Sequence, residues 1–231
     1  MSSSEPVSRS LVALYDFVTG QSSLEDTLAR IVTVTAESLA ADVGGVTMLD
    51  EAARAATVGA TDPIVAEIDE AQYRPDRGPC LQSMRTGTVV RTDDLRTDGR
   101  WPEFARSATA HGILSTLSLP LLTQSRTEGA LNVYAARPAA FGHAAEAFGM
   151  AFANQAVIGL SYWKQATVAE HLRRALESRA EIEQAKGILI ATIGCDPDEA
   201  FDLLREQSQS ENRKLRDVAV ELVARQRRRS D

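Results

Sequence analysis

The feature that most constrains the fold is a long stretch in the second half of the chain that has the composition of a single helix. Residues from about Ala144 to Leu176 include no proline and little glycine, so a flexible linker is not expected there. From Val168 onward, residues on one side of such a helix recur at alternating spacings of four and three, as in coiled coils. They are Val168, Leu172, Ala175, Arg179, Ile182, Lys186, Leu189 and Ile193. We therefore expect a continuous helix that joins two domains and can pair with a second copy of the chain.

Two cations interrupt this seam. Arg179 and Lys186 occupy positions that are otherwise apolar, and a cation there disfavours close helix pairing. Glu183 lies four residues after Arg179 and three before Lys186, so its carboxylate can pair with either cation. The neighbouring Gly187 costs roughly 1 kcal/mol relative to alanine in a helix, which indicates close approach by another backbone or by a ligand. A solvated, ion-paired helix face is the plainer interpretation of the three charged residues.

Start signals mark a second helix after this one. Asp196 suits the N-cap position, Pro197 suits the first helical position, and Glu199 is placed to complete a capping box. We expect Phe201 and Leu204 to face inward from this helix.

A third helix is expected to begin at Asn212, a favourable capping residue. Cations crowd its start, at Arg213, Lys214 and Arg216. They oppose the helix dipole, so their placement indicates a role other than helix stability. A helix N-terminus presents free N–H groups that bind phosphate, and a polyanion is therefore the natural partner. The inward side of this helix is apolar and consists of Leu215, Val218, Ala219, Leu222 and Val223.

From Leu176 to Val223, the order and spacing of many residues closely resemble the ANTAR domain, a three-helix RNA-binding module of bacterial transcription antiterminators. The matching residues are Leu176, Arg179, Ile182, Glu183, Gln184, Ala185, Lys186, Gly187, Ile188, Leu189, Asp198, Glu199, Ala200, Phe201, Leu204, Arg205, Asn212, Arg213, Lys214, Leu215, Arg216, Asp217, Val218 and Ala219.

The resemblance implies which residues contact RNA. In this family the target is a pair of adjacent hairpins with six-nucleotide loops, whose stabilisation prevents a terminator hairpin from forming. Each protomer of a dimer would hold one loop. This chain departs from the family at Ile190, often methionine, and at Ser208, often alanine, where the added hydroxyl needs a partner. The expected RNA-binding residues are Arg179, Ala185, Lys186, Gly187, Arg205, Asn212, Arg213, Lys214 and Arg216.

Net charge argues against non-specific nucleic-acid binding. The whole chain carries a net charge of −7, and the part from Glu170 onward is close to neutral. Strongly salt-driven binding to any polyanion is therefore not expected. Specificity would come from RNA shape and unstacked loop bases. We interpret the terminal arginines, Arg225 and Arg227 to Arg229, as a solvated tail.

The first two thirds of the chain have the pattern of an α+β domain. A helix is expected from Leu24 to Ala40 and the long helix from about His143. Pro120 lies in an alternating run that is typical of a half-buried antiparallel strand, and it indicates an edge or a bulge. The five expected strands are Val43–Leu49, Ala55–Gly59, Thr88–Thr92, Leu114–Leu121 and Gly129–Ala135.

This order of elements resembles a GAF sensor domain of the kind that precedes ANTAR modules. The matching residues are Gly78 to Leu81, Asp94, Leu95, Arg100 to Pro102, Phe104, Ser115, Leu117 to Leu121, and Gly129 to Tyr134. GAF domains place a small-molecule pocket between an antiparallel sheet and the helices that cover it. The pocket residues that this implies, which would equally serve to fill a core, are Tyr73, Cys80, Met84, Trp101 and Phe104.

The domain division follows from the two resemblances. We expect a GAF domain at residues 1–160, followed at residues 161–231 by a coiled-coil helix and an ANTAR domain. Tyr162 and Trp163 fall at the junction and are expected to be dimer or domain contacts.

Motifs that the sequence lacks indicate which kinds of protein this chain is not expected to be. Cys80 and Cys195 are far apart in sequence, and neither Cys-x-x-Cys nor His-Glu-x-x-His occurs, so no metal site and no cofactor are expected. The start of the chain has no apolar signal segment, and no apolar run approaches the length of a membrane span. We therefore expect a cytoplasmic protein that is neither secreted nor membrane-spanning.

The leading hypothesis is a non-enzymatic regulator that acts in transcription antitermination. Its GAF domain is expected to sense a small molecule, and its ANTAR domain is expected to bind RNA as part of a homodimer. A DNA-binding regulator is one alternative, because three short helices can imitate a helix-turn-helix. An enzyme that reduces free methionine sulfoxide through Cys80, as some GAF domains do, is another, and a buried, unreactive Cys80 would contradict it. The sequence leaves open the GAF ligand, the target transcripts, the orientation of the dimer and whether a ligand switches it.

Overall fold

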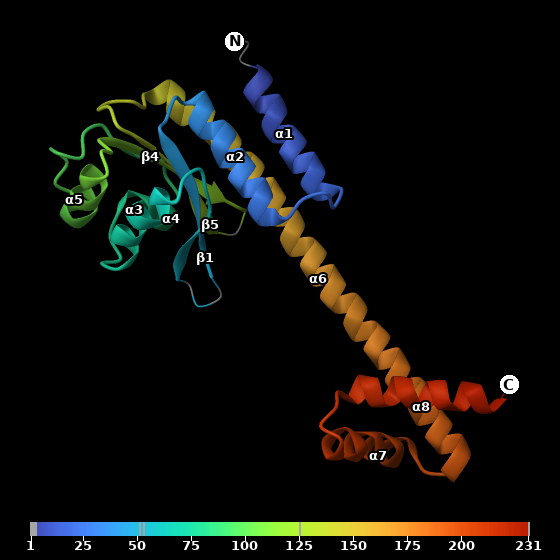
Figure 1. Ribbon diagram of the computed structural model, residues 1–231. Helices are drawn as coiled ribbons and strands as arrows, with labels where there is room; N and C mark the ends of the chain where they lie inside the picture. The colour runs from blue at the N-terminus through green and yellow to red at the C-terminus, as the bar shows by residue number, and fades with distance from the viewer. Residues whose placement is uncertain (1–3, 51, 53, 125, 231) are drawn as a thin grey trace. The chain divides into compact units, whose positions relative to one another are not determined.

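The computed structural model describes residues 4–230 apart from residues 51, 53 and 125, with side chains described from residue 5 to residue 226. Figure 1 shows the elements in chain order. The chain forms two compact units, which divide between Trp163 and Lys164. The first unit holds the sheet and the second holds the C-terminal helices. The side chains of Arg227, Arg228 and Arg229 lie outside the described part, so the interpretation of these arginines as a tail stays a prediction.

The first unit is built on a five-stranded antiparallel sheet whose strand order is β2-β1-β5-β4-β3. All five expected strands are present, each within two residues of its expected start, so the α+β class is confirmed. The strands are β1 (Val43–Leu49), β2 (Ala55–Ala60), β3 (Val90–Thr92), β4 (Ser115–Leu122) and β5 (Thr127–Ala135).

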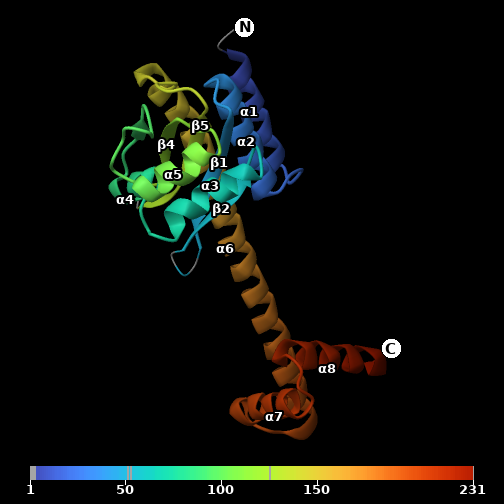
Figure 2. The same ribbon diagram turned by 60° about the vertical axis from the view of Figure 1, so that its left-hand side comes forward.

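Helices cover both faces of this sheet (Figures 1 and 2). On one face, α2 (Leu24–Ser38) and the first part of α6 (His143–Ile193) pack against the strands, and α1 (Ser4–Val18) packs against α2. The helices on the other face are α3 (Ile64–Tyr73), α4 (Pro79–Thr86) and α5 (Pro102–Ala110). Helix α2 and the long helix α6 confirm two predictions, whereas α1 was not predicted.

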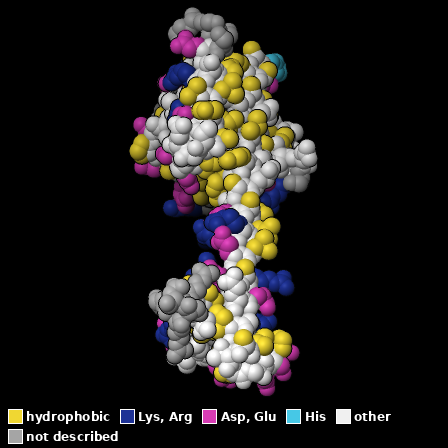
Figure 3. Space-filling view, turned by 90° about the vertical axis from the view of Figure 1, so that its right-hand side faces the viewer, with side chains coloured by type: hydrophobic (Ala, Val, Ile, Leu, Met, Phe, Trp, Pro, Cys, Tyr) yellow, Lys and Arg dark blue, Asp and Glu magenta, His cyan; other side chains and the backbone are white. Residues whose placement is uncertain are grey.

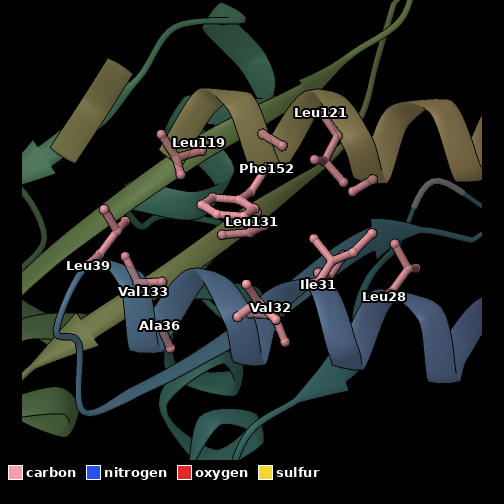
Figure 4. Packing of buried hydrophobic residues seen from close by; sticks show 14 of the residues in the cluster. Leu28, Ile31, Val32, Ala36, Leu39, Leu119, Leu121, Leu131, Val133 and Phe152 are labelled. Carbon is pink, nitrogen blue, oxygen red and sulfur yellow. The ribbon is translucent and has the colours of Figure 1, made fainter. Parts of the chain in front are cut away.

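The larger core lies between α2, α6 and the sheet (Figure 4). Alternate residues of β4 and β5 point into it, among them Leu119 and Leu131, and meet Ile31 of α2 and Phe152 of α6. These four side chains are fully buried, and each contributes about 1.5–3 kcal/mol by leaving water. Truncating Phe152 to alanine would cost about 3–5 kcal/mol and break this packing.

The expectation that β4 is half-buried was wrong. Its residues from Ser115 to Leu121 are buried, including Thr116 and Ser118. The alternate residues of the run are polar, but they face the helices of the second layer instead of solvent. Pro120 lies beyond the point where β3 stops pairing with β4, and the register shifts after Leu121. Of the two predicted explanations for Pro120, the edge position is confirmed, whereas the shift in register falls between Leu121 and Leu122 and not at Pro120.

The second unit packs the end of α6 against two shorter helices, α7 (Pro197–Ser210) and α8 (Leu215–Ser230). Asp196 caps α7 and forms the expected capping box with Glu199. Ala185 of α6, Leu204 of α7 and Val218 of α8 are buried together at the centre of this unit. The inward position of Leu204 is confirmed, whereas Phe201 is 37% exposed and does not belong to the core.

Asn212 ends the second helix and does not cap the third, which corrects the sequence prediction. Its φ of 49° is left-handed. Its N–H donates to the Gln209 carbonyl at 3.2 Å, and the next N–H, of Arg213, donates to the Ser208 carbonyl at 2.9 Å. This pair of bonds is a Schellman motif with asparagine in place of glycine. The Ser208 hydroxyl donates to the Arg213 carbonyl at 2.5 Å, so it has the partner that it needs.

Candidate nucleic-acid interface

The surface of α6 carries the first group of expected RNA-binding side chains. The Lys186 ammonium lies 3.2 Å from both carboxylate oxygens of Glu183, and its side chain is only 16% exposed. Arg179, one turn before Glu183, is exposed and forms no ion pair with the residues that the structure describes. Of the two cations, Arg179 is therefore the one free to meet an anion.

Two small residues between these charges have different surroundings. Ala185 is fully buried against Leu204, Val218 and Ala219, so its side chain belongs to the core and is not accessible to a base. Gly187 is exposed, and a Cβ placed on it would meet no atom of the described chain within 4 Å. Helix packing within the described chain therefore does not account for this glycine.

A second group of cations lies at the start of α8. Arg213 bridges Glu211 and Glu221 at 2.7 Å each, and Arg216 reaches across to Glu181 of α6 at 2.6 Å. Hydrogen bonding to Glu181 raises the pKa of Arg216 above its ordinary value. The carbonyl of the intervening Lys214 accepts the Asp217 N–H of the first turn at 2.9 Å.

Lys214 and Arg205 are the last two of the six cations that were expected to bind RNA. The side chain of Lys214 is exposed and without an ion pair among the described residues. Arg205 of α7 lies 2.9 Å from Asp202 of its own helix. Four of the six expected cations are thus held by carboxylates, whereas Arg179 and Lys214 have no ion pair within the described part of the chain. The spacing of Glu183 and Lys186 in the sequence predicted their ion pair. The ion pair of Arg216 with Glu181 was not predicted, because the two residues are far apart in the sequence.

This arrangement favours a selective anion site over a general one. Exposed ion pairs are weak, so a well-placed phosphate can replace a carboxylate partner. A phosphate in any other position would gain little binding energy, because most of these cations are already paired with carboxylates. An anionic ligand therefore gains from these cations only where its charged groups match their positions.

A buried polar cluster lies beneath the helices on the other face of the sheet. Asp69 of α3 accepts hydrogen bonds from the hydroxyls of Tyr134 and Thr57 and from the Gln72 amide. Burial raises the pKa of the Asp69 carboxyl to about 6, and these hydrogen bonds oppose that rise. Tyr73 joins the cluster through a 2.9 Å bond to Thr57.

The five expected pocket residues do not line one cavity. Tyr73 and Met84 border a hollow of about 930 Å³ between the β1–β2 hairpin and helices α3 and α4. Trp101 and Phe104 border a separate hollow of about 40 Å³ beside Arg77. Cys80 belongs to α4, on its buried side, and its sulfur atom lies 3.8 Å from that of Met84 one turn later.

The surroundings of Cys80 argue against thiol chemistry. Its side chain is fully buried, and burial raises the pKa of the thiol to about 12. The thiolate is the reactive form, so this thiol is inert near neutral pH.

No group of three or more metal-ligating side chains occurs in the part of the chain that the structure describes. No described helix is long and apolar enough to cross a membrane.

Comparisons with protein families identify both units. The family model described as GAF domain matches residues 21–161, and the one described as ANTAR domain matches residues 170–223. No curated protein sequence matches the chain.

Solved structures share the fold of the first unit. The GAF domain of a phosphoenolpyruvate-protein phosphotransferase from Acinetobacter is 17% identical with a TM-score of 0.54, over 72% of this chain and 99% of that one. The free methionine-R-sulfoxide reductase from Neisseria meningitidis is 17% identical with a TM-score of 0.53, over 72% of this chain and 96% of that one. A bacteriophytochrome from R. palustris is 13% identical with a TM-score of 0.56, over 88% of this chain and 47% of that one. At these identities the likeness shows the fold alone.

Proposed function

This chain belongs to the GAF domain family and carries an ANTAR domain at residues 170–223, and from that premise we propose that it is a non-enzymatic regulator that binds folded RNA and promotes transcription antitermination. ANTAR domains are RNA-binding antitermination modules, and GAF domains are sensors. Such a regulator acts on nascent transcripts, which places it in the cytoplasm.

The observation that carries the proposal is the open surface around Gly187. A glycine in the middle of a helix costs roughly 1 kcal/mol relative to alanine, and nothing in the described chain packs against this one. Its neighbour Lys186 lies on the same helix as Arg179, which has no ion pair among the residues that the structure describes. A loop base that stacks close to the helix backbone while phosphates meet the cations would make use of all three residues.

The remaining cations extend this surface. The ion pair between Arg216 and Glu181 brings the start of α8 beside α6, and Arg213 and Lys214 precede Arg216 in the chain. We assign phosphate or base contacts to Arg179, Lys186, Arg205, Arg213, Lys214 and Arg216. Asn212 contributes indirectly, because its left-handed conformation directs the chain toward Arg213, Lys214 and Arg216. Ala185 contributes indirectly as well, because its small side chain allows the three helices to pack closely.

The RNA partner that we propose is a pair of adjacent hairpins held by a homodimer. The side chains of Val168, Leu172 and Leu176 are all exposed on α6, and their spacing suits pairing with the same stripe of a second copy. Each protomer would then hold one hairpin loop. Both loops are needed for tight binding, because the second contact is made within an already formed complex.

The hollow beside Tyr73 and Met84 supports a sensory role for the GAF domain. It is bordered by apolar side chains and by ion pairs, including that of Arg74 with Glu70. A small molecule bound there would act by preferring one arrangement of the helices to another. Thiol-based reduction of methionine sulfoxide is disfavoured by the burial of Cys80.

Transcription through a terminator tests the proposal. A template that encodes two adjacent hairpins upstream of a terminator is transcribed with and without the full-length protein. We expect the wild type to raise read-through, and Lys186→Ala with Arg179→Ala to abolish the rise. The control is Arg96→Ala, which removes an exposed cation that is ion-paired with Asp94 in the GAF domain. Equal read-through with and without the wild-type protein, also when the hairpins are intact, would contradict the proposal.

A further inference from the structure

Gln184 of α6 presents an unpaired amide beside the open surface around Gly187. Its side chain is exposed and forms no hydrogen bond with the residues that the structure describes. Gln184 lies three residues before Gly187, so the two residues are one turn apart on the same side of the helix. A group that can both donate and accept a hydrogen bond thus adjoins the stretch of backbone that we assign to RNA.

Gly187 separates this amide from the cations of the same helix. Each residue of an α-helix is turned by about 100° from the residue before it, so Gln184 lies about 60° to one side of Gly187. Lys186 and Arg179 lie about 80–100° to its other side. A group that rests on Gly187 therefore has positive charge along one edge and an uncharged amide along the other.

The residues around Gln184 leave room for a flat ligand. Gly187 has no side chain, and a Cβ there would meet no atom of the described chain within 4 Å. Ala180, one turn before Gln184, is exposed and small. A planar base can therefore lie close to the helix backbone with one edge toward the amide of Gln184.

The cations of the second unit cannot distinguish one base from another. Figure 3 shows Lys and Arg side chains of this unit next to Asp and Glu side chains, and the ion pair of Lys186 with Glu183 is one such contact. Cations bind phosphates, which are the same in every nucleotide. Discrimination between bases requires donors and acceptors that meet the edge of a base.

The amide of a glutamine is complementary to adenine. Its oxygen accepts hydrogen bonds and its nitrogen donates them, and both atoms lie in one plane. Adenine presents the matching pair on one edge, an amino group that donates and a neighbouring ring nitrogen that accepts. Two parallel hydrogen bonds then form between the amide and the base, and guanine, which carries a carbonyl in place of that amino group, cannot form both of them.

We propose that Gln184 reads an adenine of the hairpin loop whose base rests on Gly187. The amide oxygen accepts from the amino group of the adenine, and the amide nitrogen donates to the neighbouring ring nitrogen. Gln184 thus determines which base the interface accepts, whereas Arg179 and Lys186 hold phosphates. The inference rests on the proposed RNA-binding function and adds to it the base that is read and the residue that reads it.

An RNA that lacks the adenine amino group tests this contact. The RNA carries two adjacent hairpins with adenines in their six-nucleotide loops, and each of these adenines is replaced in turn, in both loops, by purine, which lacks only the amino group. The full-length wild type and Gln184→Ala are titrated against every RNA. The control is Gln21→Ala, which removes an exposed amide from the GAF unit.

We expect one of these replacements to weaken RNA binding by the wild type and by Gln21→Ala at least tenfold. Gln184→Ala should bind the unmodified RNA at least tenfold more weakly than the wild type does. The same replacement should weaken its binding less than about twofold further, because the amino group has already lost its partner.

Two further measurements distinguish base reading from other roles of Gln184. The side chain carries no charge, so the slope of log affinity against log salt should be the same for Gln184→Ala and the wild type. The thermal midpoint should not fall, because the amide has no partner among the described residues.

Three outcomes would overturn the inference. If Gln184→Ala binds the unmodified RNA as tightly as the wild type does, Gln184 reads no base and the proposed function stands. If Gln184→Ala loses the same factor of affinity for every RNA, or if no replacement weakens the wild type, Gln184 does not read an adenine. A wild type that binds none of these RNAs would overturn the proposed function and this inference together.

Discussion

The guanidinium of Arg216 at the start of α8 lies 2.6 Å from the carboxylate of Glu181 on α6. Thirty-five positions separate the two residues in the chain. The contact joins the first turn of the last helix to the part of α6 that lies in the second unit. It also occupies a cation that we assign to RNA, so the same pair both organises the domain and limits what can bind.

Replacing the acid should therefore strengthen RNA binding. In Glu181→Gln the amide keeps a hydrogen-bond acceptor but no longer neutralises Arg216. We expect tighter binding of paired hairpins, a steeper salt dependence, and a thermal midpoint close to that of the wild type, because the pair is exposed. Titrations at several salt concentrations measure the first two, and thermal unfolding measures the third. Weaker binding by Glu181→Gln would show that the pair positions Arg216 and does not compete with RNA.

Gly187→Ala should separate stability from binding. The new methyl group meets no atom of the described chain within 4 Å, so the helix should gain about 0.5–1 kcal/mol from the lower entropy of the unfolded chain. RNA affinity should fall at least tenfold if a loop base lies against this backbone. Denaturant unfolding and RNA titration of the same preparation measure both effects. A more stable variant that binds RNA as well as the wild type would remove the assignment of Gly187 to the interface.

Lys214→Ala should remove one phosphate contact. Lys214 has no ion pair among the described residues, so its substitution removes none of the ion pairs that hold the described helices. The slope of log affinity against log salt should become shallower by about 0.7–1. In the matched variant Arg205→Ala, the cation removed is paired with Asp202, and the change in slope should be smaller. Equal slopes for Lys214→Ala and the wild type would place this lysine outside the interface.

Asp69 should make the stability of the GAF unit depend on pH. Its pKa is raised from 3.8 to about 6, chiefly by burial. The folded state thus binds the proton more tightly than the unfolded state. The stability that this proton contributes is complete below pH 4 and is lost as the pH rises through about 6. The loss is on the order of 3 kcal/mol.

Asp69→Asn tests this dependence because its amide cannot ionise. Relative to the wild type, the free energy of unfolding of the variant should increase between pH 4 and pH 7. Denaturant unfolding at each pH, for both proteins, provides the difference and cancels the effect of other carboxylates. A difference that does not vary with pH would mean that Asp69 ionises in the folded protein as it does in the unfolded chain.

The sequence predicted elements whose signals are local. The capping box of Asp196 and Glu199 and the pairing of Lys186 with Glu183 depend on neighbours three residues apart, and both are present. Helix α1 carries a weaker signal of this kind, since Val7, Leu14 and Phe17 recur at helical spacing.

Features that depend on tertiary packing could not be predicted. Asparagine favours both the start of a helix and the left-handed residue that ends one, so Asn212 alone did not distinguish the two. Ser118 is polar and suggested a solvent-exposed face of β4, but helices on that face bury it. The ion pair of Arg216 with Glu181 follows from how α8 packs on α6, for which the sequence spacing holds no signal.

Binding of a two-hairpin RNA with six-nucleotide loops tests the central claim most directly. The full-length protein is titrated against this RNA, against a single hairpin, against a version with scrambled loops, and against duplex DNA of equal length, with Lys186→Ala in parallel. We expect tight binding of the paired hairpins alone, one protein dimer per RNA, and at least tenfold weaker binding by Lys186→Ala. Equal affinity for duplex DNA, or for scrambled loops, would contradict the assignment of this protein as a regulator that recognises paired RNA hairpins.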